Sequence, residues 1–140
     1  MLSSEANQIA NLLNLRNQLT KKYTEEDVFQ NSEDYLFKVL GNEVVACVEV
    51  RKVQWYQAEI RHLTVASAHE GKGIGKELVG CAIASAGRLG VRVVQCTIRQ
   101  DNDRSGGVFA AAGFAKVNSF FNIRSGNNVD VYQRVLCAVR

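Results

Sequence analysis

A glycine-rich segment after an apolar strand pattern contains the residue types and spacing best suited to chemistry in this sequence. The strand pattern covers residues 58–65, and glycines follow at positions 71, 73 and 75 before a helical pattern begins. Glycine lets the backbone approach a ligand closely, and the first N–H groups of a helix lack partners within the helix. These N–H groups and the positive end of the helix dipole can bind a phosphate group. The segment therefore predicts a site for a phosphorylated cofactor.

The spacing excludes two common nucleotide loops. A P-loop ending at Gly75-Lys76 would need glycine at position 70 and a hydroxyl residue at position 77, where the sequence has glutamates. A dinucleotide loop reads G-x-G-x-x-G and is followed by an acidic residue at the end of a second strand. Neither feature is present here. The segment instead resembles the diphosphate loop of the GCN5-related N-acetyltransferase (GNAT) superfamily, Q/R-x-x-G-x-G/A, with Glu70 in the place of Gln or Arg.

A second segment resembles another motif of the same superfamily, N-x-x-A-x-x-L-Y-x-x-x-G-F. It begins at Asn102, has Ser105 at the small position and Phe109 at the tyrosine position, and ends with Gly113-Phe114. An alanine-rich helix capped by Asn102 and followed by a strand would also produce this pattern. Both motifs in the family's order favour the resemblance, which covers roughly residues 44–114 of the sequence.

The resemblance implies acetyl-CoA as co-substrate. Loop N–H groups would hold its diphosphate, with Lys72 and Lys76 adding positive charge. Backbone N–H groups of Leu63 and Val65 would face the thioester, and Asn102 would either bind the pantetheine arm or act only as a helix cap. The cofactor-binding residues expected from the two motifs and the strand before them are Leu63, Thr64, Val65, Glu70, Gly71, Lys72, Gly73, Ile74, Gly75, Lys76, Asn102, Ser105 and Phe109.

Glu59 is the candidate general base. An ammonium group with a pKa of about 10.4 must lose a proton before it can attack a thioester. The segment Ala58-Glu59-Ile60 resembles the strand that carries the base glutamate in the histone-acetyltransferase branch of the superfamily. Partial desolvation can raise the pKa of such a carboxyl toward neutrality. The alternative is a solvated strand glutamate without a catalytic role.

The tyrosine that many relatives use as the general acid is replaced by Phe109, which has no proton to give. A thiol with a pKa of about 8.5 is a tolerable leaving group without full protonation, so slow turnover is expected. Tyr132 and Ser105 are possible substitutes for the missing acid. Glu70 and Phe109 also leave open a different function, an acyl-CoA-binding sensor or interaction module without catalysis.

The acceptor is expected to carry a primary amine, on a small metabolite or on a protein. His62 could either reach the active site or pack elsewhere, and the aromatic pair Trp55-Tyr56 could line an acceptor pocket or pack at a sheet edge. The acidic run 25–27 could attract a cation, but it equally suits the start of a helix.

The remaining pattern predicts an α/β fold with a mixed, mostly antiparallel sheet. The resemblance implies a GNAT fold splayed between the fourth and fifth family strands, with helices on both faces and the first family strand missing. A first helix would bury Ile9, Leu12, Leu13 and Leu19, a second would start near Thr24, and a hairpin would turn at Gly41-Asn42. Later elements are expected at 58–65, from the glycine loop to Gly90, and at 91–98, 103–112, 114 onward and 129–139.

Composition predicts one domain over residues 1–140, with a net charge of +3 and basic residues scattered along the sequence. Nucleic acid and membrane are not expected as partners, and neither is a metal, because only His62 and His69 are available without a ligand cluster. The N-terminal residues lack a signal-peptide pattern, so a cytoplasmic location is expected. The four cysteines lie in apolar patterns and are expected to be buried free thiols. A homodimer remains open.

Overall fold

The structure, a computed structural model, describes residues 1–16 and 21–136, so the predictions for Leu19 and Cys137 lie outside the described residues. The helices are α1 (Ser3–Arg16), α2 (Glu25–Gln30), α3 (Ile74–Arg88) and α4 (Asp103–Ala111), with short 3-10 turns η1 (Ser32–Asp34) and η2 (Ser67–His69). The strands are β1 (Tyr35–Leu40), β2 (Glu43–Gln54), β3 (Gln57–Val65), β4 (Val93–Arg99), β5 (Ala115–Asn122) and β6 (Asn127–Val135). None of the helices described is long and apolar enough to cross a membrane.

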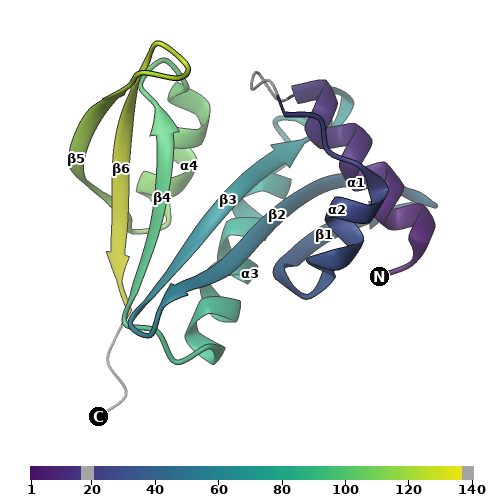
Figure 1. The fold of residues 1–140 in the computed structure, drawn as a ribbon, viewed down its shortest axis with the longest axis horizontal. Coiled ribbons are helices and arrows are strands. Elements are labelled where there is room, and N and C mark those ends of the chain that lie inside the picture. The colour runs from purple at the N-terminus through teal and green to yellow at the C-terminus, as the bar shows by residue number, and fades with distance from the viewer. Residues whose placement is uncertain (17–20, 137–140) are drawn as a thin grey trace.

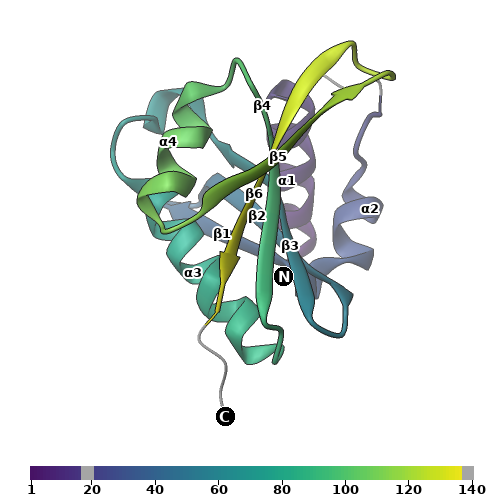
Figure 2. The same ribbon diagram turned by 90° about the vertical axis from the view of Figure 1, so that its left-hand side faces the viewer.

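The strands form one sheet in the order β1-β2-β3-β4-β6-β5. Neighbouring strands are antiparallel, except that β3 and β4 run parallel. Helices α1 and α2 cover one face of the sheet, and α3 and α4 cover the other (Figure 2). The prediction of a mixed, mostly antiparallel α/β sheet with helices on both faces is confirmed.

Strands β3 and β4 stay together only at one end. Their pairing joins residues 57–59 of β3 to residues 93–95 of β4, and beyond it the strands diverge (Figure 1). Past Glu59, β3 continues to pair with β2, while β4 continues to pair with β6. In the part of the chain that the structure describes, residues 60–65 of β3 therefore lack a strand partner on the β4 side.

A bulge interrupts β3 at His62. Cys47 pairs with Thr64 and Glu49 with Arg61, so Val48 alone faces two residues of β3. The φ angle of His62 is 58°, which is uncommon for a residue with a side chain and typical of a bulge that redirects a strand. The extra residue reverses the alternation of faces along β3, so that Leu63 and Val65 pack with the core under α3.

Two hydrophobic cores lie on the two faces of the sheet. Four buried residues of α3 recur every four positions and so lie on one side of the helix: Ile74, Leu78, Ala82 and Ala86. Val79, next to Leu78, is buried as well. The helix ends before Gly90, whose φ of 76° suits a residue without a side chain. On the other face, the predicted stripe of α1 is confirmed by three buried residues, Ile9, Leu12 and Leu13.

The cysteines differ in environment. Cys47 and Cys96 are buried, as expected, and burial raises the pKa of each thiol to about 12. The prediction was wrong for Cys81, which is exposed. It follows Leu78 by three residues but lies just outside the arc of the helix that the five buried residues of α3 span.

Candidate functional site

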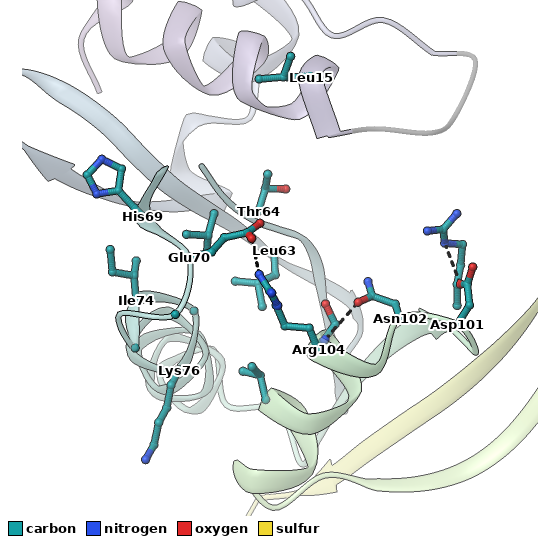
Figure 3. A pocket seen from close by; sticks show the side chains of 17 residues that line it. Leu15, Leu63, Thr64, His69, Glu70, Ile74, Lys76, Asp101, Asn102 and Arg104 are labelled. Atoms are coloured by element: carbon teal, nitrogen blue, oxygen red, sulfur yellow. Dashed lines mark hydrogen bonds and ion pairs between the residues drawn. The ribbon is translucent and has the colours of Figure 1, made fainter. Parts of the chain in front are cut away.

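A cavity of about 760 Å³ opens where β3 and β4 diverge. Its walls come from the end of β3, the glycine loop, the first turn of α3, the segment from β4 into α4, and one residue of α1 (Figure 3). The lining residues are Leu15, Leu63, Thr64, Val65, His69, Glu70, Gly71, Gly73, Ile74, Gly75, Lys76, Arg99, Asp101, Asn102, Arg104, Ser105 and Val108. The cavity therefore unites both sequence motifs.

The glycine loop is shaped to present backbone N–H groups. Gly71 and Gly73 have φ angles of 76° and 81°, a left-handed conformation that disfavours any residue with a Cβ. Gly73 is the N-cap of α3, and no side chain caps this helix. The first-turn N–H groups and the positive end of the dipole of a 15-residue helix are thus directed at the cavity wall formed by Gly75 and Lys76.

The N-terminus of a second helix reaches the same cavity. The Asn102 side-chain oxygen accepts a hydrogen bond of 3.2 Å from the backbone N–H of Ser105, so it caps α4 as the sequence predicts. Asn102 and Ser105 both line the cavity. Because α3 and α4 begin on opposite sides of it, two helix N-termini favour a negatively charged ligand there.

An ion pair joins the glycine loop to α4. The Glu70 carboxylate binds the Arg104 guanidinium on the wall of the cavity (Figure 3). The Glu70 side chain is 23% exposed and the Arg104 side chain 68% exposed. Arg104 was not anticipated from the sequence, although it lies two residues after the motif asparagine.

The sequence of this chain matches the acetyltransferase (GNAT) family over residues 6–114, which is more than half of its length. The chain belongs to this family. No curated protein matches it significantly in sequence.

Solved structures show the same fold at low sequence identity. YncA of Salmonella typhimurium, a putative acetyltransferase with its cofactor acetyl-CoA, is 17% identical with a TM-score of 0.87, and the match covers 100% of this chain and 93% of that one. Ard1 of Thermoplasma volcanium is 18% identical with a TM-score of 0.84, over 98% and 95% of the two chains. A ribosomal-protein-alanine N-acetyltransferase of Brucella melitensis is 18% identical with a TM-score of 0.82, over 97% of each chain.

Most cofactor-binding residues predicted for this GNAT chain line the cavity, but Lys72 and Phe109 do not. Phe109 is 3% exposed and packs edge-on against Phe114, with ring centroids 5.2 Å apart. Lys72 lies in the glycine loop and is exposed. Direct contact of either residue with a cofactor stays a prediction.

The candidate base lies where the two strands of the GNAT sheet separate. Glu59 is half-buried and is the last residue of β3 that pairs with β4, opposite Gln95. It lines neither the large cavity nor the smaller one described below. The catalytic role of Glu59 therefore remains a prediction.

Six lining residues were not predicted from the sequence: Leu15, His69, Arg99, Asp101, Arg104 and Val108. Five of them lie within a few residues of the two GNAT motifs, so proximity to those motifs is the signal that could have identified them. Leu15 comes from the distant helix α1, and its neighbours in the sequence do not indicate a place at the cavity.

Proposed function

We propose that this chain is an acetyl-CoA-dependent N-acetyltransferase that moves an acetyl group to a primary amine, with residues 1–140 acting as one domain. The observation that carries the proposal is the convergence of the uncapped α3 N-terminus, the Asn102-capped α4 and the unpaired edge of β3 on one cavity. Family membership supports acetyl transfer, and the acetyl-CoA named for the similar Salmonella protein supports that co-substrate.

We propose a place in the cavity for each part of the co-substrate. The diphosphate would bind the N–H groups between Gly71 and Lys76, and the pantetheine arm would run along the unpaired edge of β3. Backbone N–H groups of Leu63 and Val65 would then stabilise the oxyanion that forms when the amine attacks the thioester carbonyl. Glu59 would remove the proton from the ammonium group before that attack.

The departing thiolate would take up a proton released from the new amide nitrogen. Ser105 lines the cavity and stays a candidate donor, whereas the Tyr132 hydroxyl lies against Gly106 of α4. Phe109 in the core supplies no proton, so we expect slow turnover.

The second candidate function is an acyl-CoA-binding module without catalysis. It is favoured by the absence of Glu59 from the cavity lining and by a phenylalanine at the tyrosine position. A thermal-shift titration with acetyl-CoA and a thiol-release assay over a panel of primary amines separate the two. A raised Tm with thiol release supports the enzyme, a raised Tm without release supports the binding module, and no shift contradicts both.

We expect Glu70→Gln to tighten acetyl-CoA binding. The substitution removes a negative charge from the proposed diphosphate site and frees Arg104 from its ion pair. Two like charges about 4 Å apart in water repel by about 1 kcal/mol, which corresponds to a change of about fivefold in the dissociation constant. Isothermal titration calorimetry would measure this change in the dissociation constant for acetyl-CoA.

The matched control for this substitution is Glu77→Gln in the first turn of α3. Glu77 does not line the cavity and binds Lys38 at 3.0 Å on the surface. We expect the control to leave the dissociation constant within about twofold of the unmodified protein. Equal or weaker binding by the Glu70 variant would show that the diphosphate does not lie beside this carboxylate.

A further inference from the structure

A second, polar cavity of about 290 Å³ lies on the α1 and α2 face of the sheet. The segment between α1 and α2 contributes Lys21 and Tyr23, and β2 contributes Glu49 and Arg51. Its volume is at the small end of the range for ligand pockets, so it suits a compact molecule.

The bulge in β3 lies between this cavity and the proposed acetyl-CoA site. Regular alternation would place Arg61 and His62 on opposite faces, but both line the polar cavity. The next residue, Leu63, lines the large cavity. Two consecutive residues of one strand thus contact two different cavities, so this part of β3 forms a wall of both.

A buried carboxylate in the polar cavity has one oxygen without a hydrogen bond, although the Tyr35 hydroxyl, which also lines the cavity, hydrogen-bonds to the carboxylate. The Glu49 side chain is 4% exposed, and its Oε1 has no hydrogen-bond donor among the described residues. The Arg61 Nε is 3.4 Å from Oε1, and an Arg51 terminal nitrogen is 3.9 Å from Oε2, so both ion pairs are loose. Because a buried carboxylate with an unused acceptor is costly, this oxygen is suited to receive an N–H donor from a ligand.

The cavity also presents charges of both signs. Three cationic side chains line it, from Lys21, Arg51 and Arg61, together with two acidic ones, from Asp27 and Glu49. Arg51 also forms an ion pair of 3.5 Å with Asp34, which lies outside the lining, so the positive and negative groups at the cavity are equal in number. A ligand that carries both an ammonium group and a carboxylate would satisfy both kinds of charge.

Tyr23 and His62 form an uncharged part of the cavity wall, and hydrogen bonds fix the position of Tyr23. The Tyr23 hydroxyl lies 3.1 Å from His62 Nε2, and the two rings meet edge to face. The Asn14 side chain binds both the N–H and the carbonyl of Tyr23, at 2.7 and 2.8 Å. Burial lowers the pKa of His62, so its imidazole is neutral near pH 7 and does not repel an ammonium group.

We propose that this polar cavity binds the acceptor and that the acceptor is a free amino acid. Glu49 accepts hydrogen bonds from its ammonium group, and the cationic side chains of Lys21 and Arg61 face its carboxylate. The inference rests on the proposed acetyl transfer, because β3 lines both this cavity and the one proposed to hold acetyl-CoA.

Calorimetric titration of the CoA-saturated protein with each of the twenty free amino acids tests the site without requiring turnover. We expect at least one amino acid to bind and Glu49→Gln to weaken that binding at least tenfold. The matched control, Glu43→Gln, changes an exposed residue of the same strand that lines neither cavity, and should leave binding within twofold. Binding of no amino acid, or binding that Glu49→Gln leaves unchanged, would overturn the proposal.

A second variant, at Lys21, tests the site without a change at the buried residue Glu49. Lys21→Met should weaken binding of the amino acid at least threefold but leave binding of its decarboxylated amine unchanged. If circular dichroism shows that Glu49→Gln is unfolded, the Lys21→Met variant alone tests the proposal. Equal effects of Lys21→Met on binding of the amino acid and of its decarboxylated amine would overturn it.

Thiol release separates this proposal from the proposed function. We expect acetylation of the bound amino acid at least ten times faster than that of its decarboxylated amine or of a peptide beginning with the same residue. Faster acetylation of the amine or the peptide overturns the proposal and leaves the transferase function standing. Amino-acid binding that depends on Glu49, without thiol release from any amine, supports the site and rejects the transferase function.

Discussion

Gly75→Asp is expected to raise the dissociation constant for acetyl-CoA about 100-fold, which is about 3 kcal/mol of binding free energy. Gly75 lies in the first turn of α3 and lines the cavity, and its φ angle is not positive, so a side chain causes no backbone strain. The new carboxylate would occupy the position of the diphosphate and repel it. The same carboxylate at a helix N-terminus stabilises the helix, so Tm should be unchanged or higher.

The control for this prediction is Gly80→Asp in the same helix. Gly80 is exposed, and a Cβ built there meets nothing within 4 Å. We expect this variant to bind acetyl-CoA as the unmodified protein does, measured by calorimetry alongside thermal unfolding. A folded Gly75→Asp variant whose dissociation constant changes less than threefold would place the diphosphate elsewhere.

Glu59→Gln is expected to lower kcat about 100-fold and to leave the KM for acetyl-CoA unchanged. General-base catalysis contributes roughly 100- to 10,000-fold, and the lower figure applies because Glu59 lies at the edge of the site rather than in its lining. Loss of the base should also make the remaining rate increase with pH up to about 10, where the free amine forms without help.

Steady-state kinetics between pH 6 and 10 would measure both effects. Glu43→Gln, at the start of β2, serves again as the matched change and should keep the rate of the unmodified protein. A Glu59 variant with an unchanged rate at every pH would remove this residue from the mechanism and direct the search for the base to the groups around His62.

The glycine loop and the Asn102 helix could be predicted because their information is local. Gly71 and Gly73 adopt positive φ angles that other residues disfavour, and Asn102 bonds a backbone N–H three residues away. A positive φ angle and a helix cap depend on residues nearby in the chain, so residue types and their spacing in the sequence reveal both. Predicted element boundaries were correspondingly close: the helix expected to stop at Gly90 ends at Arg88.

Features that depend on distant contacts were not predicted. The bulge at His62 depends on how β3 pairs with Val48 of β2, and the sequence around it still alternates well enough to suggest a regular strand. The ion pair between Glu70 and Arg104 joins residues 34 positions apart. The exposure of Cys81 was missed because an apolar residue beside a buried stripe does not show which face of the helix it occupies.

By itself the sequence determined the order of helices and strands, the glycine loop at residues 70–76 that leads into a helix, and the resemblance to the acetyltransferase family, since each follows from short-range spacing and backbone preference. Only the tertiary structure decided that the separation of β3 and β4 begins after Glu59, that a bulge at His62 changes the faces of β3, and that Glu49 lies buried in a second cavity. The physical reason is that strand pairing and side-chain burial are set by partners far away in the chain, which no local pattern encodes.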